Sequence, residues 1–239
     1  MTTTKTRTDG SASSTRTYQW YADGKWRDPP RLFDDLEPYS GDIYAYAPDC
    51  GPEEAKIAIA AANAAFPAWA ETPPAEKARR FLKAAEIVRR RRDEIAEILA
   101  RETGTSLPVA AAQQDYVAAA LEQAANWVYL PKGEVLVSNL PNTHSIGVRR
   151  PVGVVASFTP WNAAQILSWR AVVNPLAAGC TVVVKPSEFA PISAGLLVAE
   201  IAEEAGIPPG VVNVVPHAPG AAGAIADEFF ASDDVRAIN

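Results

Sequence analysis

The stretch that decides the fold is VGVVASF, residues 152–158, which runs directly into the turn TPWN, residues 159–162. A run without charge and rich in valine is typical of a strand that is buried on both faces. Three similar runs follow: CTVVVKP (180–186), GVVNVV (210–215) and VRAIN (235–239). Segments with helical character separate them, at 164–178, 191–205 and 220–230. This alternation predicts an α/β fold with a doubly wound parallel sheet, a Rossmann-like cofactor domain over residues 151–239.

Polar side chains follow each of the first three predicted strands. They lie in Thr159–Asn162, in Lys185–Glu188 and in Pro216–Gly220. Because ligands of such folds bind outside the carboxyl ends of the strands, these three turns are expected to line one crevice. An ammonium at Lys185 and a carboxylate at Glu188 suit the hydroxyls of a dinucleotide, although a solvated loop pair is an equally open interpretation from spacing alone.

Asn162 also allows two interpretations. Its neutral amide can donate a hydrogen bond to an oxygen that becomes negative during a reaction, as in an oxyanion hole. An asparagine directly before a helix can instead cap that helix. The residue pattern by itself leaves both roles open.

The segment before the parallel core, residues 18–132, combines short strands with helices. YQWYADGKWRD (18–28) and GDIYAYAPD (41–49) alternate in the manner of edge strands. Helices are predicted from Gly51 to Pro67, from Thr72 or Pro73 to Gly104, and from Pro108 to Tyr129. Two strands with a turn at Pro141 and Asn142 predict an antiparallel ribbon over 133–150, which is marginal alone and is expected to pack on a partner subunit or on a second lobe.

Composition excludes several classes of partner and compartment. The net charge of −6 gives no basic face for nucleic acid, and the run Arg89–Arg92 lies in a helical pattern that spreads its side chains around the axis. No uncharged stretch is long enough for a membrane span. Residues 1–17 are expected to be a disordered tail, with a transit peptide as the alternative.

The two cysteines, Cys50 and Cys180, lie far apart and belong to no CxxC motif. They predict neither a disulfide framework nor a metal site, and a reducing compartment, the cytoplasm, fits best. No GxSxG elbow and no GxxxxGK[ST] loop is present, so a serine hydrolase and a P-loop NTPase are not indicated.

Four segments in this order resemble the aldehyde dehydrogenase superfamily, and the resemblance covers residues 37–239. They are FPAWAETPPAEKAR (66–79), GVVASFTPWN (153–162), NPLAAGCTVVVKPSE (174–188) and AGIPPGVVNVV (205–215). The resemblance implies a cofactor domain, a catalytic domain and an oligomerisation ribbon, to which residues 133–150 are similar. It also implies a homo-oligomer, a dimer or a tetramer, and the binding of NAD without a GxGxxG fingerprint.

Carried over residue by residue, the resemblance implies roles at the predicted crevice. Asn162 would hold the carbonyl oxygen of an aldehyde substrate. Lys185 and Glu188 would hold the adenosine ribose, and the carboxylate of Glu188 would favour NAD over NADP because it repels a 2′-phosphate. The other residues implied at the cofactor are Phe158, Thr159, Trp161, Ser187, Gly220 and Gly223.

Two departures from the family pattern matter for function. Ala163 and Ala164 stand where the family commonly has Phe-Pro, and with QILSWRA (165–171) they are similar to the branch acting on vanillin, benzaldehyde or salicylaldehyde. The family's nucleophilic cysteine and general-base glutamate lie beyond the position that corresponds to Asn239. Oxidation of an aldehyde through a thiohemiacetal and a thioester is therefore expected to need a cysteine outside these residues. The alternative is an inactive fragment that only binds nucleotide or pairs with a full-length subunit.

Overall fold

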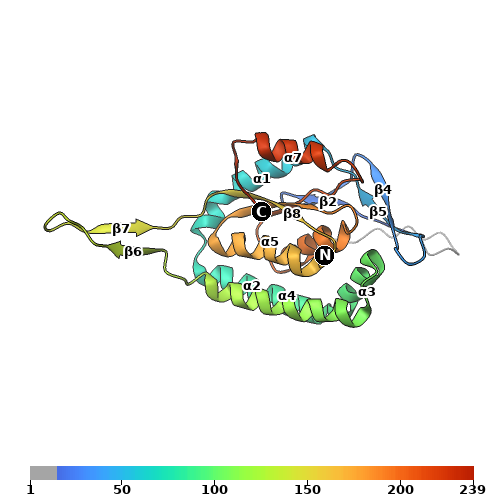
Figure 1. Ribbon diagram of the computed structural model, residues 1–239, viewed down its shortest axis with the longest axis horizontal. Helices are drawn as coiled ribbons and strands as arrows, with labels where there is room; N and C mark the ends of the chain where they lie inside the picture. The colour runs from blue at the N-terminus through green and yellow to red at the C-terminus, as the bar shows by residue number, and fades with distance from the viewer. Residues whose placement is uncertain (1–14) are drawn as a thin grey trace.

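The computed structural model describes residues 15–239, and its core is one six-stranded sheet with the order β11-β8-β9-β10-β2-β3 (Figure 1). The four predicted strands β8 (Val154–Thr159), β9 (Thr181–Pro186), β10 (Val212–Val214) and β11 (Val235–Ile238) pair in parallel. An antiparallel hairpin of β2 (Trp20–Ala22) and β3 (Lys25–Arg27) extends the sheet past β10. Every residue of β9 and β10 is buried, as expected for strands covered on both faces. The predicted parallel α/β fold is confirmed.

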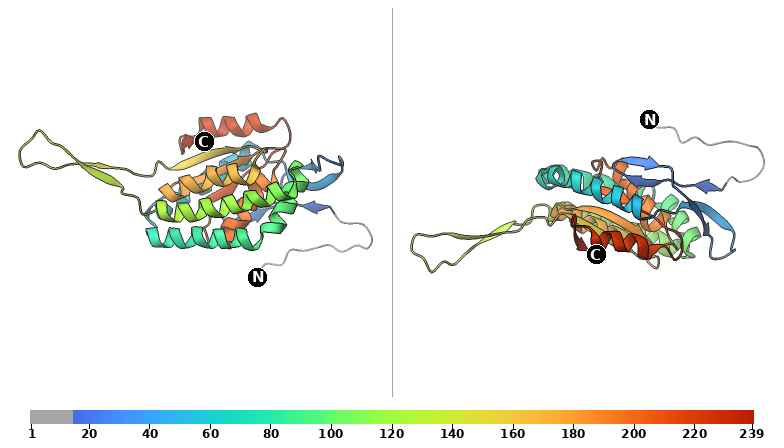
Figure 2. Two further views of the ribbon diagram at one scale, coloured as in Figure 1. Left: turned by 60° about the horizontal axis from the view of Figure 1, so that its bottom comes forward. Right: turned by 90° about the horizontal axis from the view of Figure 1, so that it is seen from above.

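Helices cover both faces of this sheet (Figure 2). One face carries α5 (Ala164–Ala178) and a π-helical turn, η1 (Ile192–Leu196), which continues into α6 (Leu197–Glu204). The other face carries α7 (Ala222–Ala231) beside α1 (Pro52–Glu71). The chain leaves β8 toward β9 through α5 and returns from β10 to β11, on the other side of β8, through α7. The strand order therefore reverses at β8, and the carboxyl end of β8 is the topological switch point of the sheet.

A further helical layer, α2 (Pro74–Arg90), α3 (Arg92–Thr103) and α4 (Leu107–Trp127), lies outside α5 and α6. The first predicted helix was expected to stop at Pro67, but α1 continues to Glu71. Tertiary packing explains the difference, because Trp69 is buried and its Nε1 donates to the Leu176 carbonyl at 3.1 Å. Burial of this indole outweighs the lost backbone hydrogen bond of a proline inside a helix.

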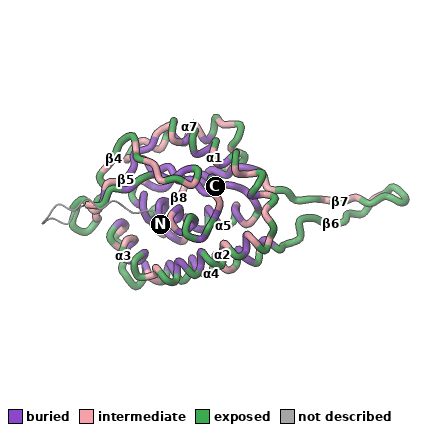
Figure 3. The backbone as a smooth tube through the Cα atoms, turned by 180° about the vertical axis from the view of Figure 1, so that it is seen from behind, coloured by how far each residue is buried: buried purple, intermediate pink, exposed green. Residues whose placement is uncertain are grey.

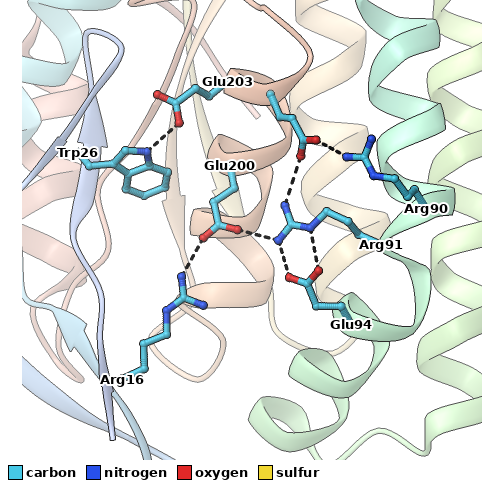
Figure 4. Close-up of polar contacts among 8 residues, drawn as sticks. Arg16, Trp26, Arg90, Arg91, Glu94, Glu200 and Glu203 are labelled. Carbon is cyan, nitrogen blue, oxygen red and sulfur yellow. Dashed lines mark hydrogen bonds and ion pairs between the residues drawn. The ribbon is translucent and has the colours of Figure 1, made fainter. Parts of the chain in front are cut away.

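The prediction of a single helix up to Gly104 is wrong in one respect, because the helix breaks at Arg91 into α2 and α3. Arg91 has φ −94° and ψ 12°, outside the helical region, and its guanidinium donates to Glu94 and Glu200 (Figure 4). The other three arginines of the run each contact a different acidic side chain: Arg89 with Glu122, Arg90 with Glu204 and Arg92 with Asp115. The run is thus dispersed among ion pairs.

A second, three-stranded sheet has the order β1-β5-β4. It consists of β1 (Arg16–Thr17), β4 (Leu32–Leu36) and β5 (Ile43–Pro48). Residues 1–14 of the predicted tail lie outside the described range. Arg16 and Thr17, which were also assigned to that tail, form β1 instead, because they pair in parallel with β5 and Arg16 donates to Glu200 at 3.3 Å.

The antiparallel ribbon is present as β6 (Gly133–Leu136) and β7 (Ser145–Val148), and it projects from the body (Figure 3). Its apolar side chains are exposed; those with the largest exposure are Val135, Val137, Leu140, Ile146 and Val148. Apolar groups on a two-stranded ribbon outside the main core fit the prediction that it packs on a partner.

Candidate active site

The carboxyl ends of β8 and β9 meet at the switch point. Phe158 lies opposite Lys185 and Thr159 opposite Pro186 in the parallel register. The register continues past the strands, because the amide of Ser187 donates to the Thr159 carbonyl at 2.8 Å. The loop after β10 reaches the same edge through His217, which contacts Lys185. The three predicted turns are thus brought to one edge of the sheet.

Lys185 is not a solvated loop residue, because only 6% of its surface is exposed. Its Nζ lies 2.6 Å from His217 Nε2 and 3.3 Å from the Pro186 carbonyl oxygen. The ring of Phe158 lies 5.7 Å from the same ammonium. Burial lowers the pKa of Lys185, and the nearby carboxylate of Glu188 opposes that shift. An ammonium has three donors, so these two contacts leave one for another acceptor.

His217 is the residue of this edge that sequence reasoning did not select. Its side chain is fully buried, and Nδ1 lies 2.9 Å from the Ala218 carbonyl oxygen. Burial is the main cause that lowers its pKa, and Lys185 adds to the shift. A signal existed in the sequence, because His217 follows a predicted strand end by two residues. Nothing in the local pattern, however, indicated that the ring faces Lys185.

Asn162 and Trp161 are both exposed in the loop between β8 and α5. Asn162 does not cap the following helix, because the N-cap position of α5 is Ala163 and no side chain caps it. The capping interpretation is therefore wrong, and the amide is free of that local role. Asn162 lies on the same edge of the sheet as Lys185. The two side chains are not hydrogen-bonded to each other, because Lys185 Nζ contacts His217 and the Pro186 carbonyl oxygen.

Phe158 and Thr159 face different surroundings at the end of β8. The half-buried ring of Phe158 packs edge-on against Phe229 at 5.7 Å and parallel to Phe230 at 6.5 Å, both from α7. The hydroxyl of Thr159 donates to the Ala194 carbonyl at 2.9 Å in the interior. The aromatic side chain therefore lies at the edge, whereas the side chain of Thr159 supports the backbone behind it.

The remaining predicted residues lie in the loops after β9 and β10. The hydroxyl of Ser187 is 3.5 Å from a carboxylate oxygen of the half-buried Glu188. Gly220 has φ +84°, a left-handed conformation that by itself favours glycine. A Cβ added at Gly223 would meet no protein atom within 4 Å, so packing within the chain does not require glycine near the start of α7.

Other features lie away from this edge. Cys50 and Cys180 are both buried and free, and burial raises the pKa of the Cys50 thiol well above its usual range. Across residues 15–239, no group of three or more His, Cys, Asp or Glu side chains is arranged to hold a metal ion. No helix in that range has the length and hydropathy to cross a membrane. A cavity of about 630 Å³ lies beside α3 and is lined by residues such as Glu37, Arg101 and Leu107.

The chain is a doubly wound α/β protein, with a lysine and a carboxylate at the switch point, where sheets of this kind bind their ligands. The chain belongs to the aldehyde dehydrogenase family, whose model matches residues 26–239.

Individual relatives act on aromatic aldehydes according to their names. Vanillin dehydrogenase from Pseudomonas sp. (strain HR199 / DSM 7063) is 38% identical over 209 residues, which are 87% of this chain and 43% of that protein. The salicylaldehyde dehydrogenase of Pseudomonas putida G7, solved with salicylaldehyde, has a TM-score of 0.90 at 30% identity and covers 94% of this chain and 46% of its own. A benzaldehyde dehydrogenase of Corynebacterium glutamicum has a TM-score of 0.87 at 31% identity, covering 92% and 47%.

The chain spans less than half the length of these relatives. The solved structures of similar fold include NAD-dependent and NADP-dependent enzymes.

Proposed function

We propose that this chain supplies the cofactor-binding part of an NAD-dependent dehydrogenase that oxidises an aromatic aldehyde to its carboxylic acid. The observation on which the proposal chiefly rests is that Asn162, Lys185 and Glu188 lie at or just after the carboxyl ends of β8 and β9, which meet at the switch point of a sheet from this family. The names of the vanillin, benzaldehyde and salicylaldehyde dehydrogenases support an aromatic substrate. The small side chain of the half-buried Ala163, beside Asn162, would leave room for a ring, whereas Ala164 is fully buried against α3 and α4.

The dinucleotide fits the residues of this edge. Lys185 keeps one ammonium donor beyond its contacts with His217 and Pro186, and that donor suits a ribose hydroxyl. Glu188 offers a carboxylate that accepts from the ribose 2′-hydroxyl and repels a 2′-phosphate, which favours NAD over NADP. Gly223 allows a ligand close to the start of α7, because the protein itself leaves space there. When bound, NAD supplies the acceptor for the hydride of the aldehyde.

Asn162 is proposed as an oxyanion donor. Its amide needs no proton shift to donate to an oxygen that gains negative charge, and it is exposed and not used as a helix cap. The nucleophile would be a thiolate from outside residues 1–239, because Cys50 and Cys180 are both buried and the pKa of the Cys50 thiol is raised. The ribbon would join copies into a dimer or tetramer, in the cytoplasm.

The test is an assay of NADH formation with the protein purified from its complete reading frame. A panel of benzaldehyde, vanillin, salicylaldehyde and aliphatic aldehydes is offered with NAD or with NADP. We expect the ring aldehydes with NAD to have the highest kcat/KM. Equal rates on aliphatic aldehydes would remove the aromatic assignment, and no NADH from any aldehyde would remove the dehydrogenase. Binding of NAD without turnover would favour the alternative of a chain that only binds nucleotide.

A further inference from the structure

The proposed function leaves the buried imidazole of His217 without a role. The ring comes from the loop after β10 and reaches across the sheet edge to the ammonium of Lys185 at the end of β9, 2.6 Å away. Both side chains are almost completely buried. Two titratable groups that share a short contact in a buried place constrain each other's protonation.

The second ring nitrogen determines which tautomer is present. His217 Nδ1 lies 2.9 Å from the Ala218 carbonyl oxygen, which can only accept a hydrogen bond. Nδ1 therefore carries the ring proton, and in the neutral ring Nε2 is an acceptor. The ammonium of Lys185 donates to that acceptor. A proton on Nε2 would instead put two positive groups against each other, so the contact exists only with a neutral ring.

The contact with His217 also orients the ammonium. One donor of Nζ goes to Nε2 and a second goes to the Pro186 carbonyl, with the Phe158 ring beside them. With two of three donors fixed, the direction of the third is fixed as well. A lysine without the imidazole would keep its charge and lose this direction.

Charged groups around the ring come from three segments. Lys185 and Glu188 face it from β9 and the following loop, and Asp49 faces it from the end of β5. Asp49 accepts from the amide of Ala218 at 2.9 Å and from Arg31 Nε at 2.8 Å, which holds the loop of His217 in place. The carboxylates raise the pKa of His217, but burial is the largest cause and lowers it below its ordinary value of 6.5. The ring is thus neutral at pH 7.

We infer that His217 is a positioning residue of the nucleotide site: its neutral ring holds the ammonium of Lys185 toward the ribose, and a proton on the ring releases that ammonium. The inference rests on the proposed function, because it requires Lys185 to contact the nucleotide. It adds a pH dependence to nucleotide affinity, with binding weaker in acid.

The test measures the Kd of NAD by calorimetry from pH 8 down to the lowest pH at which the protein stays folded, with the protein from the complete reading frame. For the unaltered protein we expect Kd to rise in acid as the ring takes up a proton, and to be about tenfold higher once the ring is protonated, the size of one lost hydrogen bond to a charged group. His217→Gln keeps an acceptor near the position of Nε2 and cannot titrate, so its Kd should stay close to the neutral-pH value throughout. His217→Leu removes the acceptor and should weaken binding about tenfold at every pH.

His144→Gln is the matched control, because His144 is the only other histidine and lies exposed in the ribbon. It should keep the full pH dependence. The inference is overturned if His217→Gln titrates like the unaltered protein, or if His217→Leu binds NAD normally. If the unaltered protein binds neither NAD nor NADP at any pH, the proposed function fails as well, so the two failures are distinguishable.

Discussion

Two buried pairs of titratable side chains lie in different places in this molecule. Lys185 and His217 meet at the carboxyl edge of the parallel sheet. Asp35 of β4 and Glu102 of α3 meet behind η1, where Glu102 accepts from the amides of Ile192 at 2.6 Å and Ser193 at 2.7 Å and from the Ser193 hydroxyl. The first pair keeps a free donor at the switch point. The second pair is buried in the interior, where Asp35 is 3% and Glu102 is 1% exposed.

The difference teaches that burial and a shifted pKa do not by themselves mark a functional site. Burial is the main cause that raises the pKa of both Asp35 and Glu102. The other partners of Glu102, however, are two backbone amides and a hydroxyl that hold η1 against α3. Position relative to the strand ends separates the pair that we propose to contact a ligand from the structural pair.

The largest expected effect is on the structural pair. Glu102→Ala leaves the amides of Ile192 and Ser193 buried without acceptors and should destabilise the protein by about 3–5 kcal/mol. Urea unfolding measures this loss. Glu97→Ala, on the exposed face of the same helix, is the control and should change the free energy of unfolding by less than about 0.5 kcal/mol. Equal losses from the two variants would show that the enclosed pair has no structural role.

The opposite result is expected at the switch point. Asn162→Ala should lower kcat by about 10²–10³-fold, the usual effect of losing one oxyanion donor, with no loss of stability. Steady-state kinetics with an aromatic aldehyde, together with a thermal melt, measures both quantities. Asn174→Ala, also exposed and on α5, is the matched control. An unchanged kcat in Asn162→Ala would remove the proposed role of this amide.

The contrast between the two pairs also explains what the sequence could predict. The four parallel strands and the loops at their ends follow from apolar runs and from the rule for open α/β sheets, so the position of Lys185 and Glu188 at the sheet edge could be predicted from the sequence. The Asp35–Glu102 pair and the ring of His217 were not found, because their partners lie 67 and 32 residues away in the chain. Two helix ends were predicted wrongly for a similar reason. The first helix continues past Pro67, where Trp69 donates to the Leu176 carbonyl, and the second breaks at Arg91, which donates to Glu200.

A smaller effect concerns pH. Burial and the neighbouring Glu102 raise the pKa of Asp35 from 3.8 to about 9, and no N–H or O–H of residues 15–239 donates to its Oδ2. Asp35 therefore keeps its proton in the folded state. Glu102 loses its proton more easily than Asp35, because two amides and a hydroxyl donate hydrogen bonds to its carboxylate. A raised pKa gives stability that is complete below pH 4 and is lost as the pH rises toward 9. One proton corresponds to at most about 1.4 kcal/mol per pH unit.

The free energy of unfolding should consequently fall between pH 6 and pH 8.5. Asp35→Asn, which cannot titrate, should flatten this slope, and Asp34→Asn, on the exposed face of β4, should leave it unchanged. Urea titrations at four pH values measure the slopes. The protonated state of Asp35 is contradicted if the Asp35→Asn slope equals that of the unaltered protein.

The smallest effect tests an intermediate case, the half-buried ion pairs of Figure 4. Glu200 accepts from Arg16 at 3.3 Å and from Arg91 at 3.0 Å, and its side chain is 19% exposed. Glu200→Ala removes the same charge as Glu102→Ala, but Arg91 keeps Glu94 and Glu204 as partners, so no buried group is left alone. We expect a loss of about 1 kcal/mol in urea unfolding, smaller in high salt because exposed ion pairs are screened. A loss as large as that of Glu102→Ala would mean that the removed charge, rather than the donors left without acceptors, determines the loss of stability.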